Sequence, residues 1–278
     1  MLGTNNIISK DSLVKLVAKK KYKYLDIYHE KRNFFFQGLP PLLLLFFSIK
    51  SGFSQGNQNS NPIFFDKVIG IENTGLYQGI LYSEKYRTIN EKTPYLISGK
   101  EFVEGSVYYE GQQYDGVKLK YNVFEDVVLV KLVSHVGGGG TLQLLNNYLE
   151  YFTIRDRKFT KIEKQDAPSI GVYGHFEVVL TSPYFTLLIK HVKRDFDRKD
   201  RKSVYHEFIP GKNHYVLLYK EKYYKVNSKK DITAIFPKQK KHIDKFYNIA
   251  NKLKDKNPNR FHISLIKSIE TVLPEKAN

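Results

Sequence analysis

The sequence predicts a mainly β fold, in which an antiparallel meander closes into a barrel-like or sandwich body and is followed by two or three C-terminal α-helices. Composition is the first observation: 21 Tyr and 19 Phe occur among 278 residues, and both residue types favour half-buried strands. Between residues 63 and 227, short apolar runs alternate with Gly, Asn and Asp turn signals. After residue 228 the apolar residues change to helical spacing.

Residues 31–54 have the pattern of a secretory signal peptide. Lys31 and Arg32 form a basic start, residues 42–47 form an apolar core, and small residues precede a cleavage site at Gln55. The apolar segment at 34–49 is short for a helix that crosses a bilayer. Retention of this segment as an uncleaved anchor is the alternative.

The remaining segments follow from composition and pattern. We interpret residues 1–30 as a leader of doubtful start, either an over-extended gene start or a basic amphipathic helix at a membrane surface. Residues 55–62 have the composition of a flexible linker. We expect an antiparallel β domain at 63–227 and a helical segment at 228–274 that packs on it.

The clearest strand pattern lies within residues 105–133. Asp115 and Gly116 form a tight-turn signal and predict a hairpin at that point. Four apolar side chains then alternate with polar ones and are expected to face the core: Val117, Leu119, Tyr121 and Val123. Residues 127–133 are nearly all apolar, which predicts a strand buried on both faces.

Further strands follow toward the C-terminus. We expect one hairpin about Asp156 and another about residues 210–213, the second pairing 204–209 with 215–219. Residues 195–202 are dense in charge, and we interpret them as an exposed loop.

Helix signals occupy the C-terminal segment. Ser228 is a good N-cap, and Asp231 completes a capping box. An apolar stripe predicts a second helix over 237–254, and a third helix is expected over 259–272.

Motifs for catalysis or metal binding are missing from the sequence. The chain has no Cys, which excludes thiolate metal sites and Cys nucleophiles. Neighbouring strands could bring His175, Glu177 and His191 together around a metal, and the competing interpretation is three unrelated polar positions on a sheet. Adjacent Glu125 and Asp126 could be a carboxylate pair for general acid–base work, but neighbouring residues on a strand point to opposite faces, so a turn is the simpler interpretation. We assign no catalytic, cofactor-binding or metal-binding residue.

Charge is concentrated in the C-terminal third. Residues 190–260 hold 21 Lys and Arg against 8 Asp and Glu, a net charge of +13, whereas the whole chain carries +17. Such a region can meet an anionic surface, and a solvated lysine-rich face is the simpler interpretation.

Turn-and-strand motifs recur along the β region. They are NTGLYQG at 73–79, GSV at 105–107, YDGV at 114–117, YNV at 121–123, EDVV at 125–128 and YYKVNSKKD at 223–231. This set is similar to that of a group of uncharacterised exported proteins of Bacteroidetes. The resemblance implies export and a β-rich body, and it carries over no catalytic or binding residue.

We therefore expect a non-enzymatic binding or interaction module without a cofactor, exported to the periplasm, the outer envelope or the medium. Its partner would be an anionic surface or an envelope protein that meets the basic C-terminal region, and export argues against a nucleic-acid partner. The alternative is a small-ligand-binding β-barrel, or an uncharacterised enzyme with a cavity in the β body. A deep apolar pocket with converging polar groups would favour that alternative.

Overall fold

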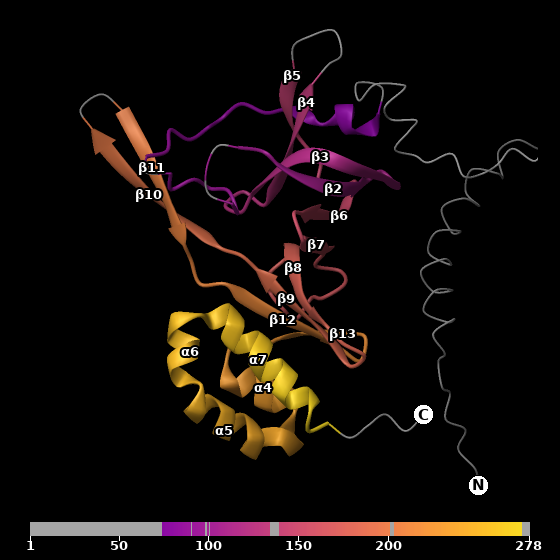
Figure 1. Ribbon diagram of the computed structural model, residues 1–278, viewed down its shortest axis with the longest axis vertical. Coiled ribbons are helices and arrows are strands. Elements are labelled where there is room, and N and C mark those ends of the chain that lie inside the picture. The colour runs from indigo at the N-terminus through magenta and orange to yellow at the C-terminus, as the bar shows by residue number, and fades with distance from the viewer. Residues whose placement is uncertain are drawn as a thin grey trace, which may run out of the picture. The chain divides into compact units, whose positions relative to one another are not determined.

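The computed structural model of the chain is shown in Figure 1. It describes residues 74–89, 91–97, 99, 101–133, 139–200 and 203–273, all within the unit Asn57–Asn278. The leader, signal peptide and linker predicted at residues 1–62 lie outside the described residues.

Antiparallel strands make up most of the described chain, and helices follow them, which confirms the prediction of a mainly β fold with C-terminal helices. Eleven of the described strands form one sheet in the order β1-β5-β4-β3-β2-β6-β7-β8-β9-β12-β13. Their bounds are Ile80–Leu81 (β1), Val103–Tyr109 (β2), Gln112–Asn122 (β3), Val127–Val133 (β4), Gly139–Gln143 (β5), Leu149–Ile154 (β6), Arg157–Ile162 (β7), Gly174–Thr181 (β8), Phe185–Lys190 (β9), His214–Tyr219 (β12) and Lys222–Lys225 (β13). A short 3₁₀ turn, η2 (Gly75–Gln78), precedes β1. This sheet ends at β1 and at β13, so its described strands do not close into a barrel.

The hairpin between β2 and β3 turns at Glu110 and Gly111, so the predicted turn at Asp115 and Gly116 is wrong. Both turn residues have positive φ, 52° and 79°. Asp115 and Gly116 lie inside β3 at a bulge, where the pairing with β2 shifts by one residue. Gly116 has a φ of 68°. Because a glycine at positive φ serves a bulge as well as a turn, the local sequence did not separate the two.

The predicted faces of the central strands are confirmed. The four side chains expected to face the core are all buried: Val117, Leu119, Tyr121 and Val123. On the opposite face Lys118 is exposed, as the alternation requires, whereas Asn122, expected on the same wet face, is fully buried. Residues 127–130 of β4 are buried on both faces. The hairpin about Asp156 is also present, as β6 and β7.

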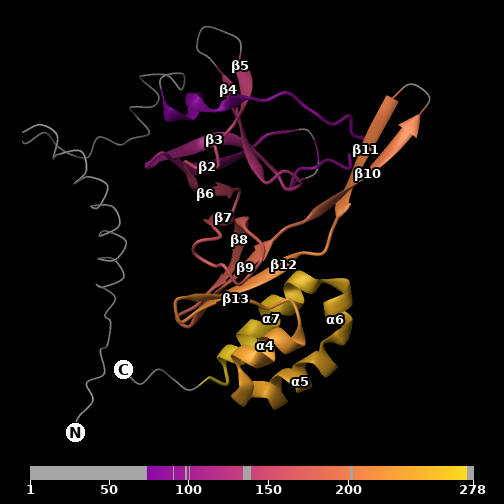
Figure 2. The same cartoon turned by 180° about the vertical axis from the view of Figure 1, so that it is seen from behind.

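A separate two-stranded sheet extends from the ends of β9 and β12 as an arm, visible in Figures 1 and 2. It consists of β10 (Lys193–Asp200) and β11 (Ser203–Pro210). The predicted loop at 195–202 and the predicted pairing of 204–209 with 215–219 are therefore wrong. Most of the described β10 is exposed and tolerates a charged composition that resembles a loop, whereas Glu207 and Phe208 of β11 are buried. Asp195 pairs across the arm with His206 at 2.8 Å.

The C-terminal segment folds into more helices than predicted. Within the described residues they are α4 (Lys229–Ile235), η3 (Pro237–Gln239), α5 (Lys240–Ile249), α6 (Asn251–Lys256) and α7 (Pro258–Glu270). The single helix expected over 237–254 is interrupted at Ala250 (φ −98°, ψ 16°), next to Asn251 and two residues after Asn248, residues of low helix propensity. The capping box of Ser228 and Asp231 is confirmed, with bonds of 2.9 and 3.2 Å.

Apolar packing fixes these helices beside the end of the sheet. Figure 2 shows α4 to α7 gathered next to β9, β12 and β13. Phe261 and Leu265 of α7 are fully buried in one cluster with Leu187 of β9 and Leu217 of β12. The start of α7 is therefore held at a defined position on the sheet. No helix in the part of the chain that the structure describes is long and apolar enough to cross a bilayer.

Candidate functional site

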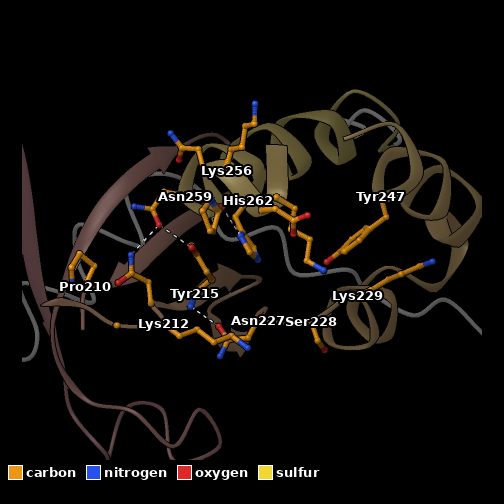
Figure 3. A pocket seen from close by; sticks show the side chains of 16 residues that line it. Pro210, Lys212, Tyr215, Asn227, Ser228, Lys229, Tyr247, Lys256, Asn259 and His262 are labelled. Atoms are coloured by element: carbon orange, nitrogen blue, oxygen red, sulfur yellow. Dashed lines mark hydrogen bonds between the residues drawn. The ribbon is translucent and has the colours of Figure 1, made fainter. Parts of the chain in front are cut away.

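A pocket of about 860 Å³ opens where the start of α7 meets the near end of β12 (Figure 3). Four stretches of the chain line it: residues 210–213 and Tyr215 around the β11–β12 connection, 227–229 at the start of α4, Tyr247 of α5, and residues 254–259 and His262 at the α6–α7 junction. The lining brings together lysines, asparagines, two tyrosines and one histidine. We call this site the α7 pocket.

The α6–α7 junction gives the pocket a helix N-terminus. Asn257 caps α7, because its Oδ1 accepts a hydrogen bond of 3.0 Å from the backbone N–H of Arg260. Pro258 occupies the first turn, where it needs no hydrogen-bond partner. The backbone dipoles of this thirteen-residue helix place partial positive charge at the pocket.

The floor of the pocket is a stacked pair of rings. Tyr215 and His262 are both buried, and their centroids lie 3.6 Å apart with an interplanar angle of 10°. The Tyr215 hydroxyl donates to Asn259 Oδ1 at 2.8 Å, and Asn213 Nδ2 donates to the same oxygen at 3.0 Å. The aromatic floor and its amide neighbours are thus fixed by hydrogen bonds between three elements. Burial raises the pKa of Tyr215 to about 12, so the phenol stays protonated at neutral pH.

His262 has an unusual position in this floor. Its Nδ1 lies 2.8 Å from the carbonyl oxygen of Pro258, so this nitrogen carries the hydrogen. Its Nε2 is buried and makes no hydrogen bond of ordinary geometry within the described residues. Burial lowers the pKa of His262 and the charge of Lys254 adds to this effect, although the carbonyls of Pro258 and Val226 act in the opposite direction. The ring is therefore held neutral beside cations.

Lysines surround the opening. Lys212, Lys254 and Lys256 are exposed, and none of them forms an ion pair within the described residues. Lys229 also lines the pocket, and its Nζ lies 2.5 Å from Asp244. Asp255 is the one carboxylate in the lining. The pocket thus has a surplus of positive charge that its own residues do not neutralise.

Tyr247 lies between two of these lysines. The Nζ atoms of Lys229 and Lys254 are 5.7 and 5.6 Å from its ring centroid. Both contacts are within the range of cation–π attraction, which holds the cations near the wall of the pocket. Burial, followed by the charge of Asp231, raises the pKa of Tyr247 to about 12. Its hydroxyl is therefore a neutral group at physiological pH.

The three residues considered for a metal site do not come together. Glu177 binds His191 (Oε2 to Nε2, 2.5 Å) and accepts two bonds of 2.7 Å from Arg157. His175 faces Asp126 instead, with 3.3 Å between Nδ1 and Oδ1. Within the described ranges no group of three or more His, Asp or Glu side chains has a geometry that could hold a metal ion.

Asp126 is more than part of a turn. Its Oδ1 accepts a bond of 2.6 Å from the Tyr121 hydroxyl and lies 2.7 Å from Lys190 Nζ. Its Oδ2 accepts a bond of 3.2 Å from the backbone N–H of His175. We call these four residues the Asp126 cluster. Burial raises the pKa of Asp126. The opposing effect of His175 and Lys190 is larger, and the pKa is lowered to about 2.

Gly174 makes room for this cluster. Its φ is +100°, and a side chain there would overlap the Asp126 carboxylate and press on Lys190. The cluster therefore joins the β3–β4 turn to β8 and β9 through an ion pair between half-buried Asp126 and buried Lys190. Sequence reasoning missed both this cluster and the α7 pocket. A signal for the pocket was present: Lys254 and Lys256 directly precede the Asn-Pro start of a helix.

No family model, no curated protein and no solved structure matches this chain. The geometry of the described residues is therefore the basis for assigning a function.

Proposed function

We propose that the protein is a non-enzymatic binding module that holds an anionic ligand in the α7 pocket. One observation supports this proposal above the others: four lysines and the N-terminus of α7 converge on one concave site that contains a single carboxylate. Concave sites with a few fixed polar groups are where proteins commonly hold small ligands.

Electrostatics favours an anion over a neutral ligand. The three lysines without an ion pair lie exposed around the opening of the pocket, and an anion bound there relieves their mutual repulsion. The dipole of α7 adds partial positive charge at the same place, although Pro258 has no N–H and the N–H of Arg260 is already bonded to Asn257. The neutral hydroxyl of Tyr247 and the asparagine amides of the lining are further polar groups beside this site, whereas the Tyr215 hydroxyl already donates to Asn259. The proposal assigns no reaction to these groups.

A closed β body with an internal ligand cavity has less support. The large sheet ends at β1 and β13, and the α7 pocket lies outside the sheet, between its end and the helices. We therefore place the ligand in the basic C-terminal region, where the charge of the chain is concentrated.

Export is the second part of the proposal. Its support is the basic, apolar and small-residue order of residues 31–54. N-terminal sequencing of the protein from its native host tests it: a chain that begins at Gln55 is expected. A chain that begins at Met1 or Leu2 would contradict cleavage.

Isothermal titration calorimetry with two ligands of the same size tests the binding function. A sulfated heparin disaccharide is expected to bind, and its desulfated analogue is expected to bind far more weakly. Two matched double variants then locate the site. Replacing Lys254 and Lys256 with Gln should weaken binding roughly 10-fold to 100-fold, because each charge pair near a surface contributes about 1 kcal/mol or more.

The control removes the same charge outside the pocket. Lys238 and Lys240 are exposed and do not line the pocket, so their replacement with Gln should change the affinity less than about twofold. Equal losses in the two double variants would show that net charge alone attracts the ligand, and the pocket assignment would fail.

A further inference from the structure

The protonation state of His262 affects which ligands the α7 pocket can bind. A neutral imidazole has one N–H group, and the bond to the Pro258 carbonyl uses it at Nδ1. Nε2 is then left with a lone pair, buried and without a hydrogen bond of ordinary geometry. The backbone of Val226 also acts on this ring, in the direction that favours a second proton. In the protonated form, each ring nitrogen would have a hydrogen to direct at a carbonyl.

The groups that face the ring explain why it is neutral. Tyr215 of β12 covers one face of the ring and excludes water. Lys254 of α6 acts on the ring electrostatically, and Lys212 and Lys229 line the same pocket from two other elements. Asp255 is the only carboxylate among the lining residues. Cations and burial both oppose a further positive charge.

A bound anion would favour the protonated form of His262. It neutralises the lysines nearest the ring and adds negative charge to the space that His262 lines. The carbonyl of Pro258 stays in place to accept from Nδ1, so a proton can enter at Nε2 without a change in the fold. The groups needed to hold an imidazolium are thus already present, and only a counter-charge is missing.

We propose that the α7 pocket takes up one proton together with its ligand, and that the ligand bears a sulfate or phosphate group that lies near protonated His262. This inference rests on the proposed function and specifies its ligand chemistry. Binding raises the pKa of His262 by linkage, so affinity is highest at acid pH and falls as the pH rises through the value that His262 has in the complex. The ligand would then bind more tightly at acid pH than at neutral pH.

Calorimetry with sodium sulfate on the full chain tests this inference. Sulfate stays fully ionised between pH 5.5 and pH 8, so a change in affinity across this range comes from the protein. We expect affinity to fall about tenfold over the range. Near the midpoint, titrations in buffers of different ionisation enthalpy should show an uptake of about half a proton or more per sulfate. The His262→Gln variant should bind with an affinity that does not change with pH.

His242→Gln is the matched control. His242 bonds to Ser268 at 2.6 Å on a part of α5 that does not line the pocket, so the pH dependence should persist in this variant. An arm with inorganic phosphate distinguishes the two ligand groups, because phosphate, unlike sulfate, changes its own protonation within this pH range. Tighter binding of phosphate than of sulfate at pH 7.5 would assign a phosphate ligand, and the reverse order a sulfate ligand.

The outcomes separate the two proposals. Absence of sulfate and phosphate binding at every pH would overturn the binding function itself. Binding with constant affinity and no proton uptake would overturn only the role of His262. Proton uptake by the wild-type protein is a readout that does not depend on whether the His262 variant folds.

Discussion

Two buried histidines occupy opposite electrostatic settings in this protein. His175, in the Asp126 cluster, faces a carboxylate that also binds Lys190 and Tyr121. His262, in the α7 pocket, faces backbone carbonyls and lysines. Each has an Nε2 that is buried and makes no hydrogen bond of ordinary geometry within the described residues. Burial is therefore shared, and the charge of the neighbours differs.

This difference separates a site whose charges balance within the chain from a site with surplus positive charge. In the Asp126 cluster, one carboxylate balances one ammonium, and the absence of a side chain at Gly174 leaves room for both. In the α7 pocket, the lysines exceed the carboxylates, and the balance needs a charge from outside the chain. We therefore expect changes in the first region to affect folding, and changes in the second to affect binding.

The largest expected effect comes from Asp126→Asn. Asn keeps the shape and tolerates the positive φ of 57° at this position, so the substitution removes the charge and replaces one of the two acceptor oxygens with an N–H donor. It leaves Lys190 buried without its counter-ion, and we expect the free energy of unfolding to fall by about 3 to 5 kcal/mol in urea denaturation.

Asp156→Asn is the control for this prediction, because Asp156 is exposed in the turn between β6 and β7. Its effect should stay within about 0.5 kcal/mol. A loss below about 1 kcal/mol for Asp126→Asn would mean that the Asp126 cluster does not hold the two halves of the sheet together.

Gly174→Ala should cost somewhat less. The new methyl group meets the Asp126 carboxylate at a backbone conformation that side chains rarely adopt, and we expect a loss of about 2 to 3 kcal/mol. Gly171 also has a positive φ, but no atom of the described residues lies near the position of an added methyl group. The difference in stability between Gly174→Ala and Gly171→Ala therefore measures the cost of the overlap with Asp126. In the Asp126→Ala background that difference should disappear; additive losses would contradict the contact.

Acid should weaken the same region. The folded pKa of Asp126 is about 2, below its ordinary 3.8, so its ionised form stabilises the fold above about pH 5. This contribution, about 2 kcal/mol, is lost as the pH falls toward 2. Glu177, whose pKa is also lowered to about 2 by Arg157 and His191 against the effect of burial, acts in the same direction. Urea denaturation at pH 7 and pH 3 should show a smaller decrease for Asp126→Asn than for the wild type, and equal decreases would exclude Asp126 as a source.

The smallest effect is expected on the pocket side. Tyr215→Phe keeps the stack on His262 and removes only the hydroxyl that donates to Asn259. One hydrogen bond corresponds to about 1 kcal/mol of stability. Tyr219→Phe serves as the control, since its hydroxyl makes no hydrogen bond in the described structure. A larger loss for Tyr219→Phe would show that the floor is held by other contacts.

Local patterns predicted the parts of the fold that local chemistry determines. The inward face of β3, the hairpin about Asp156 and the capping box at Ser228 depend on residues close together in the sequence. The pairing of β10 with β11 was missed because charge density resembles a loop, and only the path of the chain shows that these strands leave the sheet.

The two sites escaped sequence reasoning for the same physical reason. Asp126 and Lys190 are far apart in the chain, and nothing in either neighbourhood indicates the ion pair that joins them. Residues of the α7 pocket come from positions 210 to 262, so no single window shows their convergence. The sequence shows the concentration of positive charge, but it does not show the pocket around which four of the lysines lie.

One NMR experiment compares the two histidines in the same sample. Two-dimensional ¹H–¹⁵N spectra of the imidazole rings, recorded from pH 5 to pH 8 with and without sulfate, report the protonation of each ring separately. Sulfate should move the titration of His262 to higher pH and leave the signals of His175 unchanged. If sulfate does not change the titration of His262, or changes the signals of both rings equally, the α7 pocket is not the site that takes up an anion and a proton.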